Sequence, residues 1–286
     1  SLQNAGGPEP IRKQPMFDEI FRNLRDQKPL IHSITNYVTA NDCANMLLAC
    51  GASAIMADDA QEVEEIIAAC QGLCLNMGTP SARRLEAMVL AGRQANALGH
   101  PVVLDPVGVG VSRLRREGAR QLLGQVRFAV IRGNLSEVKT LATGCLDGHG
   151  VDAADRVTVE NQREIIGFAK TLAQSTGAVI AVTGETDIVA DSQRAYCILN
   201  GHPMMARVTG TGCQLSVLTA AFVTANPAHP LEAAAAAAAA MGLAGEIAYS
   251  RLSPMDGNAG YRNGMIDAMY RLTPEDLERG ARYEVR

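Results

Sequence analysis

The sequence predicts an α/β protein, a three-layer αβα sandwich whose central, mainly parallel sheet is covered by helices on both faces. Short, nearly continuous apolar segments alternate along the chain with longer segments in which apolar residues recur at helical spacing. Strands without polar alternation are typical of parallel sheets buried beneath two helical layers. The chain has 286 residues, of which 47% are hydrophobic, and this is ample for a large core.

The predicted elements follow one another in a regular order. Helical spacing predicts helices over residues 17–26, 41–50, 62–69 and 81–98. Apolar segments predict strands over residues 29–34, 54–56, 72–76, 102–104, 128–131 and 178–182. A turn at Asp191-Ser192 predicts a hairpin of residues 187–190 and 194–199. From Thr211 the chain is expected to be mostly helical, up to a polar tail that starts near Leu272.

Residues 12–286 contain no linker-like segment and are expected to form one domain, while residues 1–11 are expected to be a flexible leader or a cloning remnant. No signal peptide is recognisable. The most apolar segment, residues 231–244, is shorter than the roughly 18 residues of a spanning helix, so we expect a buried helix and no membrane contact. Seven cysteines, an odd number, argue against a disulfide framework and favour the cytoplasm.

The charge composition argues against a nucleic-acid partner. The chain carries 26 Lys and Arg against 30 Asp and Glu, a net charge of −4, and no long basic run. One short basic cluster, formed by Arg113, Arg115 and Arg116, is expected to face solvent.

Polar or functional residues follow five of the predicted strands. Ligands of open α/β sheets bind at the carboxyl ends of the strands, so these residues are the first candidates for a site. They are Asn36, the segment Met56-Ala-Asp58, Asp105, Arg132 with Asn134 and Glu137, and Thr183 with Gly184. Each alone is also typical of a turn or a helix cap, but five such clusters exceed what a structural sheet needs.

The strongest single signal is the segment Val208-Thr-Gly-Thr-Gly-Cys-Gln-Leu-Ser216, which directly precedes a long apolar helix. Gly210 and Gly212 allow a tight turn that presents backbone N–H groups at a helix N-terminus, a site suited to phosphate oxygens. The alternative is a glycine-rich helix entry needed only for packing. The P-loop, dinucleotide-binding, nucleophile-elbow and zinc-protease motifs are absent, and His32 alone is expected to be structural.

Two carboxylates could serve a metal–phosphate complex. Mg²⁺ is usually bound by one or two carboxylates, water and substrate phosphates, so Asp105 and Glu137 would suffice. Arg132 could bridge phosphate oxygens with two parallel hydrogen bonds.

Several motifs in one order resemble the hydroxyethylthiazole kinases of the ribokinase-like superfamily, over nearly the whole chain after the leader. The segments that carry this resemblance are residues 32–38, 53–57, 104–108, 131–137, 182–187 and 209–213. The resemblance implies a ribokinase-like fold and an enzyme that transfers a phosphoryl group from ATP, with Mg²⁺, to the primary alcohol of 4-methyl-5-(2-hydroxyethyl)thiazole. It also implies a homotrimer with active sites at subunit interfaces, in which Asn36 and Met56 face Cys213 of a neighbouring subunit.

The resemblance also implies roles for individual residues. Cys213 would be the catalytic residue, because related sugar and pyrimidine kinases usually carry an aspartate base there. We expect the thiol to orient the hydroxyl and to accept its proton late, since phosphoryl transfer depends mainly on positioning and charge stabilisation. The remaining assignments are Asn36, Met56 and Gly210 for the thiazole, Arg132, Asn134, Thr183, Gly184 and Gly212 for the nucleotide, and Asp105 and Glu137 for the metal.

Three other functions stay open on the sequence alone. A hydroxymethylpyrimidine-type kinase would differ in the acceptor alcohol, and Cys213 with the Asn36 and Met56 segments disfavours it. An ATP-dependent dehydratase of the same fold would reuse the nucleotide site. A non-catalytic nucleotide sensor would need neither Asp105 nor Glu137, and both are present.

Overall fold

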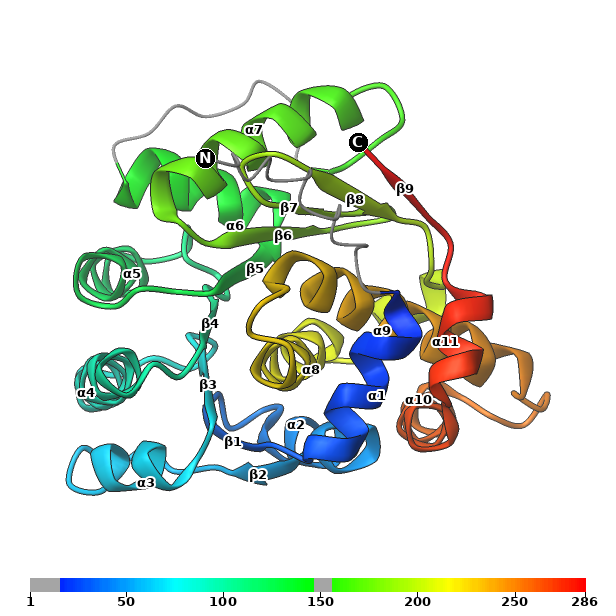
Figure 1. Ribbon diagram of the computed structural model, residues 1–286, viewed down its shortest axis with the longest axis horizontal. Coiled ribbons are helices and arrows are strands. Elements are labelled where there is room, and N and C mark those ends of the chain that lie inside the picture. Colours follow the sequence, from blue (N-terminus) through cyan, green and yellow to red (C-terminus); the bar gives the residue numbers. More distant parts are fainter. Residues whose placement is uncertain (1–15, 147–155) are drawn as a thin grey trace, which may run out of the picture.

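The computed structural model describes residues 16–146 and 156–286, and the predicted leader lies outside them. Within these residues the chain forms one sheet of nine strands in the order β2-β1-β3-β4-β5-β6-β7-β8-β9 (Figure 1). The strands are Leu30–Ile34 (β1), Ser53–Ile55 (β2), Gly72–Asn76 (β3), Val102–Asp105 (β4), Val130–Asn134 (β5), Val179–Thr183 (β6), Asp187–Ala190 (β7), Ala195–Ile198 (β8) and Tyr283–Val285 (β9). Strands β1 to β6 are parallel and the last three are antiparallel to their neighbours, which confirms the predicted mainly parallel sheet.

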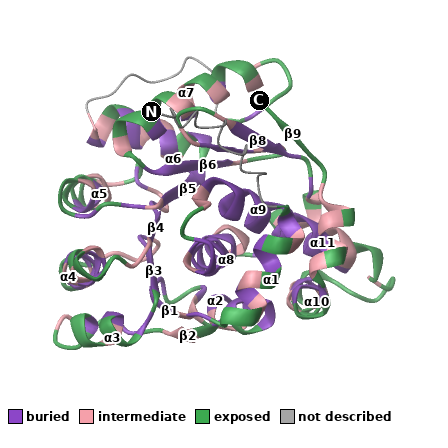
Figure 2. Ribbon diagram, viewed as in Figure 1, coloured by how far each residue is buried: buried purple, intermediate pink, exposed green. Residues whose placement is uncertain are grey.

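Helices cover both faces of the sheet, as predicted. On one face lie Phe17–Gln27 (α1), Ala40–Cys50 (α2), Thr211–Ala225 (α8), Pro230–Ser250 (α9), Asn258–Arg271 (α10) and Pro274–Gly280 (α11). On the other lie Val63–Ala69 (α3), Ala82–Leu98 (α4), Arg113–Gln125 (α5), Leu135–Thr140 (α6), the π-helix Leu141–Cys145 and Gln162–Thr176 (α7). A 3₁₀ helix, Pro203–Arg207, leads from β8 toward α8. Figure 2 shows the buried residues concentrated in the sheet and in α8 and α9.

The alanine-rich helix α9 is a core element. The helix has 21 residues because it continues past Ala244 to Ser250, so it is longer than the predicted apolar segment and by length and composition it could cross a bilayer. Helix α9 is nevertheless buried, as predicted, since 89% of its most apolar stretch lies inside the protein. The eight alanines at 233–240 are all buried, and their small side chains allow close packing against α8 and α10.

The predicted strands and helices up to α9 are present, with ends displaced by up to three residues. Helices α5, α6 and α7 were not predicted, and the predicted polar tail contains α11 and β9. Strand β9 is short and exposed, so it lacks the apolar pattern that reveals a strand. Backbone hydrogen bonds to β8 hold it, among them a reciprocal pair between Ala195 and Arg286 at 2.9 and 2.8 Å.

Two expectations about buried residues are confirmed. All seven cysteines are free and buried. His32 is buried with its Nε2 atom 2.7 Å from the carbonyl oxygen of Ala57, and burial lowers the pKa of its ring. The neutral imidazole therefore acts as a structural donor that joins β1 to the segment after β2.

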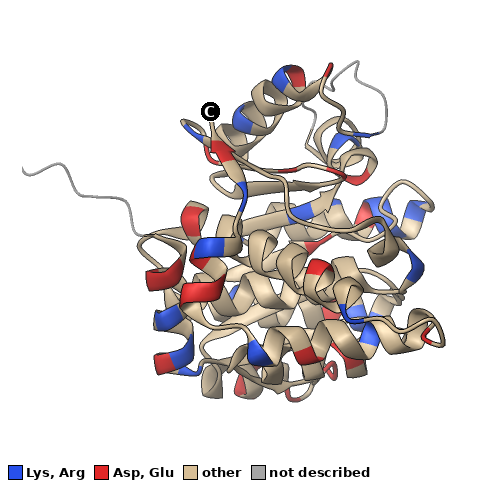
Figure 3. Cartoon of the chain, turned by 90° about the vertical axis from the view of Figure 1, so that its right-hand side faces the viewer, with Lys and Arg blue, Asp and Glu red and all other residues tan. Residues whose placement is uncertain are grey.

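Figure 3 shows that positions occupied by Lys or Arg and positions occupied by Asp or Glu are interspersed along the outer helices. Arg113 faces solvent as expected. Arg115 does not, because its guanidinium donates to the carbonyl oxygens of Met77 at 2.6 Å, Gly78 at 2.8 Å and Val107 at 2.6 Å. Arg115 therefore ties together the loops that follow β3 and β4, at the same edge of the sheet.

The close approach of α9 to the β8–α8 connection predicts that Gly242→Ala destabilises the protein. A Cβ atom at this position would lie 2.6 Å from the carbonyl carbon and oxygen of Asn200, which are backbone atoms. We expect the free energy of unfolding, measured in urea, to fall by about 1–3 kcal/mol. Gly124→Ala in helix α5 is the matched control, because nothing lies within 4 Å of its Cβ position, and alanine there is expected to stabilise by up to ~1 kcal/mol. Equal effects of the two substitutions would contradict this account of the packing.

Candidate active site

A polar cluster lies at the carboxyl edge of the parallel strands, on the face that α8 covers. Alternate side chains of a strand point to the same face. On β3, β4 and β5 a core residue is followed two positions later by a polar one, and the polar residues are Asn76, Asp105 and Arg132. Asn76 and Asp105 are direct partners in the register of β3 and β4. The sheet thus brings together side chains from distant parts of the chain.

Asp105 and Arg132 form a buried ion pair. The distance from Arg132 Nη2 to Asp105 Oδ1 is 2.8 Å, and the two side chains are 7% and 0% exposed. The Ser216 hydroxyl on α8 donates to Asp105 Oδ2 at 2.7 Å and accepts from Arg132 Nε at 2.8 Å. Burial alone would lower the pKa of Arg132, but the negative charges of Asp105 and Glu137 outweigh it and raise that pKa. The guanidinium therefore stays charged and fastens α8 to β4 and β5.

A chain of side-chain amides connects this ion pair to Cys213. Asn76 Nδ2 donates to Asp105 Oδ2 at 3.1 Å, and Asn36 Nδ2 donates to Asn76 Oδ1 at 3.0 Å. Asn36 Nδ2 also lies 3.5 Å from the sulfur of Cys213, within hydrogen-bond range for sulfur. The Oδ1 atom of Asn36 accepts from both the backbone N–H and the hydroxyl of Thr39 at 3.0 Å. All of these residues are buried.

The two glycines before Cys213 are required by their surroundings. Gly210 has φ of +85°, and a Cβ atom there would lie 2.3 Å from Thr39 Cγ2. A Cβ atom on Gly212 would lie 3.0 Å from Arg132 Nη1. The first turn of α8 can therefore approach both the Arg132 guanidinium and the Asn36–Thr39 segment only because these positions lack side chains.

Glu137 and Asn134 cap helix α6. Asn134 Oδ1 accepts from the Glu137 N–H at 2.9 Å, and Glu137 Oε2 accepts from the Asn134 N–H at 2.9 Å, which forms a capping box. Glu137 Oε1 accepts from the Gly108 N–H at 3.1 Å. Burial raises the pKa of the Glu137 carboxyl, and Asp105 adds to this effect while Arg132 opposes it. Both residues thus have a structural role besides the one that the sequence predicts.

The two predicted metal-binding carboxylates differ in how many of their lone pairs remain free. Asp105 accepts two hydrogen bonds at Oδ2 and one at Oδ1, whereas Glu137 accepts one at each oxygen. Within residues 16–146 and 156–286, no group of three or more His, Cys, Asp or Glu side chains could hold a metal ion by itself. The residues therefore fit an Mg²⁺ ion that is bound mostly by substrate phosphates and water, with Glu137 as the more available carboxylate.

The remaining nucleotide candidates lie around Arg132. The Thr183 hydroxyl on β6 accepts from Arg132 Nη1 at 3.0 Å, and this links β6 to the ion pair. The Gly184 N–H donates to Asp187 Oδ1 at 2.9 Å, so that amide is already used within the protein. Burial raises the pKa of Asp187 to about 7, although the Gly184 amide and Arg132 both oppose the shift.

One expectation about the substrate residues needs correction. Asn36 was expected to face Cys213 of a neighbouring subunit, but its amide contacts Cys213 of the same chain. Met56 follows the edge strand β2, at the same edge of the sheet as Asn36, and about a third of its surface is exposed. The structure therefore brings Asn36, Gly210 and Cys213 together, with Met56 on the open side of this edge.

Sequence reasoning missed three residues of the cluster. Asn76, Ser216 and Thr39 supply the hydrogen bonds that join the predicted residues to one another. A signal for Asn76 was available, because it ends a predicted strand in the same way as Asp105. Ser216 lies one helical turn after Gly212, on the same side of α8, so its helical spacing could have revealed it.

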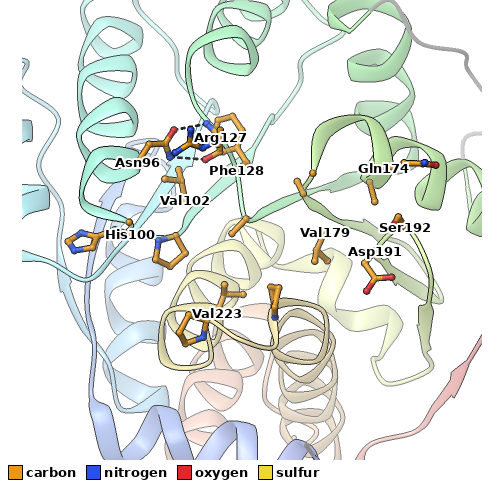
Figure 4. A pocket seen from close by; sticks show the side chains of 18 residues that line it. Asn96, His100, Val102, Arg127, Phe128, Gln174, Val179, Asp191, Ser192 and Val223 are labelled. Carbon is orange, nitrogen blue, oxygen red and sulfur yellow. Dashed lines mark hydrogen bonds between the residues drawn. The ribbon is translucent and has the colours of Figure 1, made fainter. Parts of the chain in front are cut away.

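A separate cavity of about 540 Å³ opens at the opposite edge of the sheet (Figure 4). The starts of β4 and β6 line it, together with the end of α8 and the β7–β8 turn. Asn96 and Arg127 lie at its side, where the Asn96 amide pairs with the Arg127 backbone at 2.9 and 2.7 Å. The lining includes none of the residues of the polar cluster, so the two sites are distinct.

Comparison with known proteins decides the family. The model of the hydroxyethylthiazole kinase family matches residues 21–275. This chain belongs to that family. It is 54% identical over 271 residues to the hydroxyethylthiazole kinase of Clostridium acetobutylicum, covering 94% of this chain and 99% of the relative. It is 45% identical over 280 residues to the enzyme of the same name from Desulfovibrio desulfuricans, covering 94% and 98%.

Solved structures agree with this assignment. The solved structure of the hydroxyethylthiazole kinase protein from Pyrococcus horikoshii superposes on this chain with a TM-score of 0.84 at 32% sequence identity. The match covers 94% of this chain and 98% of that one. The pyridoxal kinase of Staphylococcus aureus in complex with ADP has a TM-score of 0.59 at 15% identity, covering 91% and 98%, and shows a shared fold alone. The predicted ribokinase-like fold is confirmed.

The buried ion pair predicts that Asp105→Asn lowers stability as well as activity. The substitution leaves the buried Arg132 charge without its partner, which typically costs 3–5 kcal/mol, about the range expected here from chemical unfolding. Asp58→Asn is the matched control, because the Asp58–Arg84 pair is half exposed and exposed pairs contribute about 1 kcal/mol or less. If the two variants unfold at the same denaturant concentration, Asp105 does not have the structural role inferred from its contacts.

Proposed function

We propose that this chain phosphorylates the primary alcohol of 4-methyl-5-(2-hydroxyethyl)thiazole in thiamine biosynthesis or salvage, with ATP and Mg²⁺. The observation that carries the proposal is Cys213 in the first turn of α8, 3.5 Å from the Asn36 amide, on the same helix whose Ser216 binds the Arg132–Asp105 pair. The family match over most of the chain supports the same reaction. We place the reaction in the cytoplasm.

The nucleotide would occupy the side of the cluster formed by Arg132, Thr183 and the first turn of α8. The N–H groups of that turn lack intrahelical partners and carry partial positive charge, which favours phosphate oxygens. Gly212 would let the phosphates approach this backbone closely. Asn134 and Gly184 would contribute from the ends of β5 and β6.

The metal would bind beside the phosphates, near Glu137 and Asp105. When bound, Mg²⁺ neutralises charge that builds up on the phosphates during transfer. Glu137 would hold water molecules of the ion through carboxylate lone pairs that the backbone amides leave free. Asp105 would act mainly by holding Arg132 in place.

Cys213 would orient the attacking hydroxyl and accept its proton late. Its neighbours Cys43 and Cys74 remain protonated thiols, because burial raises the pKa of Cys43 to about 12 and that of Cys74 well above its usual range. The Gly210 and Gly212 turn would supply most of the electrostatic stabilisation through its amides.

The thiazole would lie between Asn36, Met56 and the Gly210 backbone. A small apolar heterocycle suits a mainly apolar wall with a few polar groups. Tyr37 and Val38, next to Asn36, are 77% and 58% exposed, so this wall is open in a single chain. We propose that neighbouring copies cover it, in a homotrimer whose active sites lie at the subunit interfaces.

The test of the function is ADP release from ATP and Mg²⁺, measured once with the thiazole alcohol and once with the hydroxymethylpyrimidine alcohol. We expect release with ATP, Mg²⁺ and the thiazole alcohol, and product mass increased by one phosphoryl group. Faster release with the hydroxymethylpyrimidine alcohol would assign the chain to the alternative kinase. Binding of ATP without release in the presence of either alcohol would indicate a sensor. A dehydrated product in place of a phosphorylated one would indicate the dehydratase.

The raised pKa of Glu137 predicts a shift of the acid limb of the pH–rate profile. The protonated carboxyl binds a hydrated cation poorly, and its proton is held to a higher pH than in an ordinary glutamate. As pH falls, kcat/KM for ATP should therefore decline from a pH above the usual pKa of about 4.3. Glu137→Gln should lower kcat/KM at neutral pH and flatten this limb. An acid limb that is unchanged in Glu137→Gln would assign the titration to another group.

A further inference from the structure

Asn76 is buried in the cluster and has no role in the proposed reaction so far. We propose that Asn76 is a positioning residue, which orients Asn36 so that the Asn36 amide donates a hydrogen bond to Cys213 Sγ. The proposal rests on the proposed function, in which Cys213 meets the substrate hydroxyl. Asn76 touches neither Cys213 nor the expected substrate position in any recorded contact, so it would act through Asn36.

The orientation of Asn76 is fixed by charge. Asp105 is paired with Arg132, so its carboxylate is ionised and can only accept hydrogen bonds. The end of Asn76 that faces Asp105 Oδ2 at 3.1 Å must therefore be the NH₂ group. The carbonyl oxygen of Asn76 is then turned toward Asn36, where it accepts from Nδ2 at 3.0 Å.

The orientation of Asn36 is fixed from its other end as well. The backbone N–H of Thr39 can only donate, and it lies 3.0 Å from Asn36 Oδ1. The NH₂ group of Asn36 must therefore point the opposite way, toward Asn76 Oδ1 and Cys213 Sγ. Two groups of fixed polarity, the Asp105 carboxylate and the Thr39 amide, thus impose the same direction on the chain of amides.

The consequence for Cys213 is a fixed direction of its sulfur. One hydrogen of the Asn36 NH₂ group is taken by Asn76, so the second is held toward Sγ at 3.5 Å. The sulfur is the acceptor in this contact, and its remaining lone pair or S–H can meet the substrate hydroxyl only from the other side. Without Asn76 the Asn36 amide keeps its contacts to Thr39 but loses the partner that sets its angle to the sulfur.

A purely structural role is the competing explanation. Asn76 Oδ1 also accepts from the Gly78 N–H at 2.9 Å and so stabilises the turn after β3. If this were its whole role, changes at Asn76 and Asn36 would affect the reaction independently. If Asn76 acts through Asn36, the two changes must be coupled.

The experiment is a double-mutant cycle with Asn76→Ser and Asn36→Ala, measured as kcat/KM for the thiazole alcohol. Based on the usual effect of residues that support a catalytic group, we expect each single variant to lose about 10-fold or more, with KM for ATP changed by less than about twofold. The double variant should be no slower than the slower single variant. Losses that multiply in the double variant would overturn the proposal. Asn76→Leu, whose side chain has the same branching and number of heavy atoms, replaces Asn76→Ser if the latter melts below the assay temperature.

The matched control is Asn96→Ser. Asn96 also uses both ends of its amide, in its case on the Arg127 backbone at the opposite edge of the sheet (Figure 4). It should leave kcat/KM unchanged, and a loss equal to that of Asn76→Ser would overturn the proposal by showing that any such amide has this effect.

A second readout does not depend on turnover. The rate at which iodoacetamide alkylates Cys213, followed by mass spectrometry of the peptide that contains it, should change in Asn76→Ser and not change further in the double variant with Asn36→Ala. An alkylation rate in Asn76→Ser equal to that of the parent would overturn the proposal. If the parent protein does not phosphorylate the alcohol, the proposed function fails, and the alkylation rates still decide whether Asn76 positions the group next to Cys213.

Discussion

The ion pair between Asp105 and Arg132 is the contact on which the arrangement of the site depends. Its two charges are almost fully removed from water, so each needs the other and a complete set of hydrogen bonds. The protein supplies these bonds from three directions, through Thr183 on β6, Ser216 on α8 and Asn76 on β3. Burial of the two charges therefore fixes the distances between five elements, β3, β4, β5, β6 and α8.

The same requirement explains the small residues at the start of α8. The Arg132 guanidinium packs against Gly212, and Thr39 packs against Gly210. A side chain at either glycine would therefore push the helix away from these residues. Further along, α8 packs against α9, whose buried alanines allow close contact. Small residues thus allow α8 to lie close to the polar cluster at its first turn and close to α9 along its length.

The sequence allowed the layers, most strand positions and the candidate residues at the strand ends to be derived, because these follow from local periodicity and from the rule that ligands gather at strand ends. The roles of Cys213, Met56 and Gly210 came only from the family resemblance. Asp105 and Arg132 could be named from the strand-end rule. Their pairing with each other could not, since it depends on which strands are neighbours and on which face each side chain points to. The contact of Asn36 with Cys213 of its own chain was missed for the same reason. Strand β9 could not be predicted either, because only its backbone pairing with β8 defines it.

The polarity of the network also bears on how a metal ion could be bound. Asp105 Oδ2 accepts from Asn76 and Ser216, so direct coordination of a cation at this oxygen would displace at least one of them. Displacing Asn76 would release the end of the amide chain that leads to Cys213, and displacing Ser216 would remove a contact between α8 and the ion pair. Direct binding of Mg²⁺ at Oδ2 would therefore weaken either the support of Asn36 by Asn76 or the contact of α8 with the ion pair. This favours a cation held through water and phosphate near Glu137, with Asp105 left to align Arg132 on the nucleotide side and Asn76 on the alcohol side.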